Sequence, residues 1–342
     1  MLAAANNMPD VFQWFAANDQ YYQKGLVEPL DDYVNKGIID LKNVSPNLVD
    51  TGKLDGKLYG IPLSTNAKGY YVDPAIYAKA GLTVPAEGYA TWEDLEKDLV
   101  KLKAVTGAYG GDDVMDTNNL FPYYARQRGF SVYDQSGVTV DEKTYVSFYT
   151  MKKRLIKEGL IPPIDVVKAQ KGIEDSQTVK GKAAISYVFN NQLAQIEKAA
   201  GKDLQLIPLP GPNQEKGYDV RAGLHFAISA SSKHKEEAAK FINWFINDPD
   251  ANKILNGERG VPVSSEIRNI LGESADPVQK EIYAFQDKIA ANSSKPDPMH
   301  PNNYTEIDAL FKSLDEQILF DQISPEDAYK TFKEQVAKLL AK

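Results

Sequence analysis

A polar crossing between two apolar runs, at residues 57–74, limits the fold of this chain more than any other feature. Residues 57–62 end in a proline, and the small hydroxyl and amide side chains of Ser64, Thr65 and Asn66 follow. A second run, residues 69–72, is aromatic and typical of a strand. The pattern predicts a chain that leaves one sheet, crosses a gap lined with hydrogen-bonding groups and enters another sheet. Small ligands tend to bind at such places.

The size and composition of the chain indicate a globular protein with more than one core. At 342 residues it is longer than a single hydrophobic core usually reaches, so we expect two lobes. A hydrophobic content of 43% with 25% charged residues excludes a disordered chain. The net charge of −8 argues against a nucleic-acid partner, because phosphate binding requires a basic surface. No apolar run approaches the roughly 20 residues of a membrane-spanning helix.

Cysteine is absent, which excludes disulfides, thiolate catalysis and cysteine-ligated metal. The three histidines stand at no metal-binding spacing, and Asp112, Asp113 and Asp116 do not follow the pattern of a calcium loop. We therefore expect no metal and no cofactor. Residues 1–6 have neither the basic start nor the apolar centre of a signal peptide, so if the protein is exported, we expect its export segment outside this sequence.

Helical and strand-like segments alternate along the chain. Thr91 and Asp94 predict a capped helix start, residues 235–247 carry an apolar stripe, and a helix begins after Ser324. Trp92 and Trp244 lie within these helical patterns, and we interpret both as core residues. Short apolar strands are expected at residues 10–14, 183–188, 204–207 and 224–228. This alternation predicts an α/β architecture with largely parallel sheets.

The order of several short motifs resembles the extracellular solute-binding protein family 1, the maltose-binding-protein type that serves ABC importers. The resemblance covers essentially the whole chain. The motifs are NMPDV (7–11), GKLYGIP (56–62), YVDPAIYAKAGL (71–82), TWEDL (91–95), GKAAI (181–185), SKHKEEAAKFI (232–242) and GVP (260–262). It implies a two-lobe periplasmic-binding-protein-like fold of type II with a hinge. Lobe 1 would comprise residues 1–66 and 223–270, and lobe 2 residues 67–222 and 271–342.

The same resemblance implies a function outside the cytoplasm. The protein would capture a carbohydrate, expected to be an oligosaccharide, by hinge closure and deliver it to the membrane permease of an ABC transporter. It would act as a monomer, as a cell-surface lipoprotein of a Gram-positive bacterium or in a periplasm. One departure is that the family opens with a strand–helix–strand unit before the segment at Pro9 and Asp10. That unit is not in this sequence, so we expect an exposed sheet edge in lobe 1.

Sugar recognition requires flat aromatic faces and planar amides or carboxylates. Trp14 ends a strand where relatives commonly place a stacking aromatic, and a core tryptophan is the alternative. Ser64, Thr65 and Asn66 either contact the ligand or hydrogen-bond to their own backbone in a turn. Asn66 is the best candidate for a ligand contact. Of Tyr70 and Tyr71 we expect only one, Tyr71, to face a ligand. The remaining candidates are Asn118, Asn119, Asn190, Asn191, Gly223, His225 and Tyr304.

These remaining residues are candidates because of their places in the family. Asn118 and Asn119 match a ligand-facing loop of the second lobe. Asn190 and Asn191 stand where relatives often carry tryptophan, so hydrogen bonding is expected to replace stacking there. Gly223 and His225 lie at the second crossover, where His225 either faces the ligand or is a satisfied strand histidine. Tyr304 lies in a region that contributes an aromatic in relatives.

Two other classes of function stay open. A carbohydrate-active enzyme of α/β fold needs only two carboxylates, which sequence cannot exclude among 47 acidic residues. The chain has no nucleophile elbow, P-loop, dinucleotide fingerprint or zinc-protease motif, and we expect no catalysis. A receptor for a peptide or polyamine would need a charged clamp, for which Arg221 is the visible anion-binding candidate.

Overall fold

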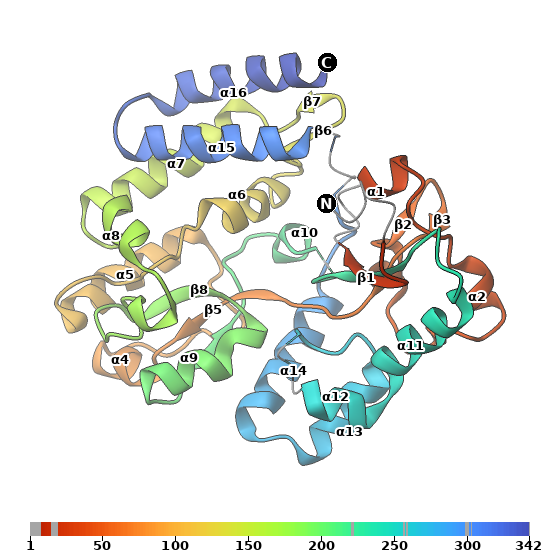
Figure 1. Ribbon diagram of the computed structural model, residues 1–342. Coiled ribbons are helices and arrows are strands. Elements are labelled where there is room, and N and C mark those ends of the chain that lie inside the picture. Colours follow the sequence, from red (N-terminus) through yellow and green to blue (C-terminus); the bar gives the residue numbers. More distant parts are fainter. Residues whose placement is uncertain are drawn as a thin grey trace. The chain divides into compact units, whose positions relative to one another are not determined.

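The computed structural model describes residues 8–14, 20–219, 222–255, 257, 259–297, 301 and 303–341. The chain forms two compact units, coloured along the sequence in Figure 1. Unit 1 comprises Met1–Ala67, Val220–Asp287 and Lys295–Asn302, and unit 2 comprises Lys68–Asp219, Lys288–Ser294 and Asn303–Lys342. The lobes expected from the sequence differ mainly at residues 271–287. These belong to unit 1, since Gln286 donates from Nε2 to Thr65 Oγ1 at 3.3 Å.

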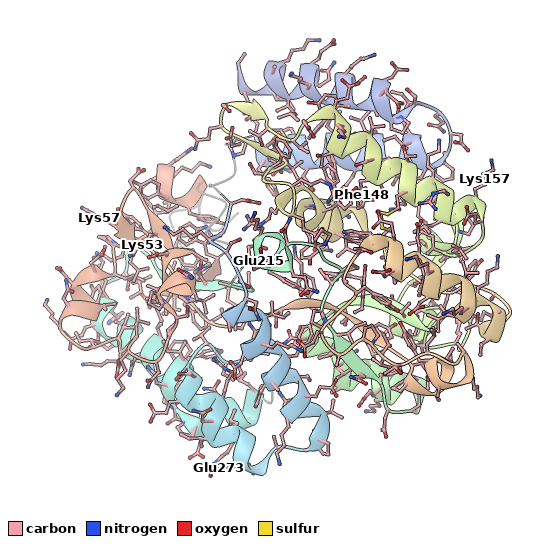
Figure 2. All side chains as sticks on the ribbon, turned by 180° about the vertical axis from the view of Figure 1, so that it is seen from behind. Lys53, Lys57, Phe148, Lys157, Glu215 and Glu273 are labelled. Carbon is pink, nitrogen blue, oxygen red and sulfur yellow. The ribbon has the colours of Figure 1, made fainter. Side chains whose placement is uncertain are left out.

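Unit 1 is built on a three-stranded sheet in the order β1 (Val11–Trp14), β10 (His225–Ile228) and β4 (Ile61–Pro62). A hairpin of β2 (Lys53–Leu54) and β3 (Lys57–Leu58) forms a separate two-stranded sheet in this unit, and Figure 2 labels Lys53 and Lys57 on this hairpin. The helices of this unit are α1 (Gln20–Gln23), α2 (Asp31–Asn35), α3 (Pro46–Asp50), α11 (Lys235–Asn247), α12 (Pro249–Leu255), α13 (Ser265–Ser274) and α14 (Pro277–Ala291), the last of which ends in unit 2.

Unit 2 has a central sheet in the order β8 (Ile185–Phe189), β5 (Lys68–Val72) and β9 (Gln205–Ile207), and a hairpin of β6 (Tyr133–Asp134) and β7 (Gly137–Val138). Its helices are α4 (Pro74–Lys79), α5 (Trp92–Thr106), α6 (Thr117–Arg126), α7 (Glu142–Lys157), α8 (Ile164–Ala169), α9 (Leu193–Ala200), α10 (Gln214–Gly217), α15 (Tyr304–Leu319) and α16 (Pro325–Leu340). Two 3₁₀ turns, η2 (Ile173–Asp175) and η3 (Asn190–Gln192), complete it.

The prediction of largely parallel sheets was wrong. Every strand pair in the four described sheets is antiparallel, and parallel pairing occurs only as the bridges Gly111–Ile185 and Asp219–Ser294. The sequence suggested parallel pairing because these strand segments are apolar on both faces. The antiparallel strand β5 is likewise buried at four of its five residues. An apolar strand between helices therefore does not fix the direction of its neighbours.

The expected helix starts are confirmed. The Thr91 hydroxyl accepts a hydrogen bond from the Asp94 amide at 3.1 Å, and Ser324 does the same for Asp327. Trp92 is buried, as expected, and donates from Nε1 to Gln127 Oε1 at 2.9 Å. Trp244 is 48% exposed and was wrongly placed in the core, because α11 turns only Ala238, Ala239, Ile242 and Ile246 fully inward.

Aromatic rings fill the core of unit 2. The ring of Phe121 on α6 lies 5.2 Å from that of Phe148 on α7 and 5.6 Å from that of Phe311 on α15. Figure 2 labels Phe148 inside this unit and Lys157 at its periphery. Such ring pairs add to the stabilisation from buried apolar area and pack α6 against α7 and α15. In the described part of the chain, no helix is both long enough and apolar enough to span a bilayer.

Candidate functional site

In unit 1, three segments of the crossing region lie side by side as a small ribbon. The Thr65 amide donates to the Val261 carbonyl at 2.9 Å, and the Val261 amide donates back to Thr65 at 3.1 Å. On the other side, the Gly223 amide donates to the Ser64 carbonyl at 2.9 Å. The two predicted crossovers, at Ser64 and Thr65 and at Gly223, are thus hydrogen-bonded to each other, and the ligand contacts of these residues stay a prediction. Ser64 and Thr65 are buried.

Two glycines allow Asn66 and Ser64 to pack against the backbone of this ribbon. A Cβ atom on Gly223 would lie 2.7 Å from Ser64 Oγ, and one on Gly260 would lie 2.8 Å from Ser64 Oγ and 2.9 Å from Asn66 Oδ1. Gly260 also has a φ of +96°, which favours glycine. Asn66 Oδ1 is buried and accepts no hydrogen bond from the described residues, so it can accept one from a ligand hydroxyl or a water.

His225 lies in the sheet of unit 1, opposite Trp14 on β1 and Pro62 on β4. The Thr51 hydroxyl donates to the Leu48 carbonyl at 2.6 Å, so Thr51 Oγ1 must accept the 2.9 Å hydrogen bond from His225 Nε2–H. Nδ1 of His225 then carries the lone pair, buried and without a partner. Burial lowers the pKa of His225 to about 4, so the imidazole is neutral, with one ring nitrogen bonded inside unit 1 and the other without a partner among the described residues, and a ligand contact of His225 stays a prediction.

Trp14 is 3% exposed. It packs in the core of unit 1 against Val27, Leu54 and Ala227. This is the surrounding of a core tryptophan, the alternative that the sequence left open. Stacking of Trp14 on a sugar stays a prediction.

In unit 2, Tyr71 and Tyr70 point to opposite faces of β5. Tyr71 is buried and its hydroxyl lies 3.0 Å from Ser176 Oγ, while Tyr70 donates to the Val114 carbonyl at 2.7 Å. Both hydroxyls therefore have partners inside the unit. Ser176 in turn donates to Asp112 Oδ2 at 2.8 Å, so Tyr71 belongs to a network that fixes the loop before β8.

The sequence analysis missed an aromatic pair on β8. Tyr187 and Phe189 are both half-buried, and their ring centroids lie 5.6 Å apart. They pair in register with Tyr70 and Lys68 of β5, on the same face of the sheet. The Tyr187 hydroxyl is buried and has no hydrogen-bond partner among the described residues. The signal in the sequence was the period-two spacing of two aromatics in a strand, which was passed over in favour of the asparagines that follow.

The first turn of α6 lies near this pair. Lys68, opposite Phe189, donates from Nζ to the Asn119 carbonyl at 3.4 Å. Asn118 is exposed and Asn119 is half-buried. The Asp116 carboxylate caps the helix by accepting from the Asn119 amide at 2.7 Å. The structure therefore brings Asn118 and Asn119, predicted from the sequence, to the neighbourhood of Phe189.

Asp113 is a half-buried carboxyl beside the same strand, since its amide donates to Ser186 Oγ at 3.4 Å. No hydrogen bond from a described residue reaches its carboxyl group. Burial, first, and the neighbouring carboxyls of Asp116, Asp112 and Asp315 raise the pKa of Asp113 to about 8, against the effect of Lys152. Asp113 and Asp116 also raise the pKa of Tyr187, after burial.

Lys152, Thr117 and Asp315 link three helices behind the first turn of α6. Lys152 is only 9% exposed and donates from Nζ to Thr117 Oγ1 at 2.7 Å, and Thr117 donates to Asp315 Oδ1 at 2.7 Å. The Thr117 hydroxyl thus bridges the ammonium group of Lys152 and the carboxylate of Asp315. This chain joins α7, α6 and α15 and fixes the turn that carries Asn118.

Asn190, Asn191 and Tyr304 lie at two further places in unit 2. Asn190 is fully buried, Asn191 is half-buried and both lie in η3, directly after Phe189. Tyr304 is the half-buried first residue of α15. Arg221 lies outside the described residues. Within the described ranges, no three His, Asp or Glu side chains are grouped so that they could hold a metal ion.

The comparisons with known proteins give the class. The family of bacterial extracellular solute-binding proteins matches residues 1–252, and this chain belongs to that family. The fold is the two-lobe α/β fold of these proteins. A solved extracellular solute-binding protein of family 1 from Alicyclobacillus acidocaldarius is 26% identical, with a TM-score of 0.82 over 100% of this chain and 86% of that one.

Two relatives show how far the likeness extends. A maltotriose-binding protein from Pyrococcus abyssi is 25% identical over 350 residues, covering 92% of this chain and 71% of that protein. A protein from Brucella abortus that is named as a binding protein is 26% identical over 257 residues, or 72% of this chain. The match spans 60% of the length of the Brucella relative.

Proposed function

We propose that this protein is a receptor outside the cytoplasm that binds an oligosaccharide and delivers it to an ABC transporter permease. The observation that carries the proposal is the half-buried pair Tyr187 and Phe189 next to polar groups that have no protein partner. An aromatic face matches the apolar side of a pyranose ring. The carboxyl of the half-buried Asp113 can form hydrogen bonds with its hydroxyl groups.

The likeness to a maltotriose-binding protein supports a sugar of several rings. In unit 2 the residues proposed to contact the sugar are Tyr187, Phe189, Asp113, Asn118, Asn119 and Asn191. In unit 1, Ser64 and Asn66 stay predicted ligand contacts, and the buried Oδ1 of Asn66 lacks a donor. The exposed amide of Asn118 is free to bond a ring hydroxyl on either its donor or its acceptor side.

Binding with closure of the lobes, without chemistry, is the proposed mechanism. A ligand that interacts better with the closed than with the open state shifts the population by that difference in free energy. Small-angle scattering would then give a smaller radius of gyration with saturating sugar. We place the protein at a cell surface as a lipoprotein or in a periplasm, as a monomer that meets its permease there.

The proposal is tested by a thermal-shift screen of neutral and acidic oligosaccharides. A ligand that binds only the folded state raises the unfolding temperature. The sugar that gives the largest shift is then incubated overnight with the protein and analysed. A receptor returns it intact, whereas cleaved sugar would favour a carbohydrate-active enzyme. A screen in which no sugar shifts the transition would contradict the proposed function.

A further inference from the structure

We propose that Pro122 frees the main-chain carbonyl of Asn118 to accept a hydrogen bond from a hydroxyl of the bound sugar. This inference rests on the proposed function, because it concerns the first turn of α6 beside the aromatic pair of Tyr187 and Phe189. It gives the proline inside α6 a role in binding, and it adds a main-chain acceptor to the side chains already proposed to contact the sugar.

Pro122 lies inside α6, which continues on both sides of it from Thr117 to Arg126. In an α-helix the amide of each residue donates to the carbonyl four residues earlier, and for residue 122 this is the carbonyl of Asn118. Proline has no amide hydrogen, and its ring crowds the same carbonyl. The helix bond that would normally occupy the Asn118 carbonyl is therefore missing, and the crowding favours an outward tilt of this carbonyl from the helix axis.

The Asn118 carbonyl belongs to an exposed residue next to the aromatic pair. The following carbonyl, that of Asn119, accepts from Lys68 Nζ at 3.4 Å, and Lys68 pairs in register with Phe189. Hydroxyls project from the edge of a pyranose ring that stacks on an aromatic face, so an acceptor beside that face can bond one of them. A carbonyl only accepts, and the sugar must therefore offer a free hydroxyl there rather than an ether or ester oxygen.

The first turn of α6 is fixed by hydrogen bonds to other parts of unit 2. Thr117 is buried, and its hydroxyl bonds to Lys152 Nζ and to Asp315 Oδ1 at 2.7 Å each. The Asp116 carboxylate caps the same turn. A fixed turn holds the Asn118 carbonyl in one direction before a ligand arrives, so a sugar that bonds to it loses little of its gain to ordering of the protein.

The test is titration calorimetry of the wild type and of Pro122→Ala with the neutral trisaccharides maltotriose, cellotriose, xylotriose and galactotriose. Alanine restores the amide that bonds the Asn118 carbonyl within the helix. The trisaccharide that binds best should therefore bind about three- to tenfold more weakly, the usual effect of one lost hydrogen bond. Alanine favours a helix interior and proline does not, so the urea midpoint should stay equal or rise. A proline with a purely structural role would not give weaker binding by an equally stable protein.

Two further variants isolate the main-chain carbonyl. Pro325→Ala is the matched control, because Pro325 is half-buried like Pro122 but is the first residue of α16, where an amide has no partner within the helix. Its affinity for the sugar should equal that of the wild type. Asn118→Ala removes the side chain and keeps the carbonyl, so adding Pro122→Ala to this variant should weaken binding by the same factor as in the wild type.

Equal affinities of the wild type and Pro122→Ala would overturn this inference and leave the proposed function standing. An effect of Pro122→Ala that disappears in the Asn118→Ala variant would also overturn it, because Pro122 would then act through the Asn118 side chain. If no trisaccharide binds to the wild type, the proposed function fails, and this inference fails with it.

Discussion

Tyr187 and Phe189 lie two residues apart on one face of β8, with ring centroids 5.6 Å apart and an angle of 73° between the ring planes. The edge of one ring thus meets the face of the other, which fixes both rings without covering them fully. A rigid aromatic surface of this kind loses little conformational entropy when a ligand stacks on it.

Phe189→Ala should weaken binding of the best sugar by about 1–3 kcal/mol, the usual worth of a well-placed aromatic contact. Calorimetry measures the loss directly. Phe320→Ala removes another partly exposed phenylalanine of unit 2, at the end of α15, and should leave the affinity as it is. Equal affinities for the wild type and Phe189→Ala would remove the aromatic pair from the site.

Gly260→Ala should disturb the ribbon of unit 1. The new Cβ would lie 2.8 Å from Ser64 Oγ and 2.9 Å from Asn66 Oδ1, and a φ of +96° adds about 1–2 kcal/mol for a residue with a side chain. We expect a lower denaturation midpoint and weaker sugar binding. Gly272→Ala on α13, where a Cβ meets nothing within 4 Å, is the control and should be neutral or stabilising. A harmless Gly260→Ala would show that Asn66 does not depend on this close approach.

The lowered pKa of His225 predicts that the protein loses stability in acid. Its pKa is about 4 in the folded protein and 6.5 without burial, so the unfolded chain takes up a proton first. The stabilising contribution is complete above pH 6.5 and is lost as the pH falls from 6.5 to 4, by up to about 3 kcal/mol.

Urea unfolding at a series of pH values measures the slope of the unfolding free energy against pH. His225→Gln, which cannot titrate, should reduce the slope between pH 6.5 and 4. His234→Gln changes an exposed histidine next to α11 and should retain it. Parallel curves for the wild type and His225→Gln would assign the acid sensitivity to other groups.

Trp14→Ala should cost about 3–5 kcal/mol of unfolding free energy, as expected for a large side chain removed from a core. Denaturant unfolding measures this. If instead Trp14→Ala keeps its stability but loses sugar affinity, Trp14 stacks on the ligand, as the sequence first suggested.

The sequence predicted what depends on local pattern and missed what depends on packing. Helix caps such as Thr91 and Ser324 follow from residues within one turn, and the structure has them as expected. The direction of strand pairing depends on the path of the chain between β5 and β8, which no local pattern reports.

The candidate site shows the same division. The polar crossing at Ser64, Thr65 and Asn66 was visible as a run of residue types. The role of Asp113 was not, because an exposed acidic turn and a half-buried carboxyl among other carboxyls have the same local sequence. Trp244 was misplaced because an apolar stripe does not reveal which of its members the neighbouring strands cover.

The measurement that bears most directly on the account is calorimetric titration of the wild-type protein and of Phe189→Ala with the neutral trisaccharides, followed by analysis of the recovered sugar. The account predicts saturable binding of at least one trisaccharide to the wild type, an affinity for it that falls by about fivefold or more in Phe189→Ala, and a sugar that is recovered intact. Binding of no trisaccharide, or recovery of a cleaved one, would contradict the assignment of this chain as an oligosaccharide receptor.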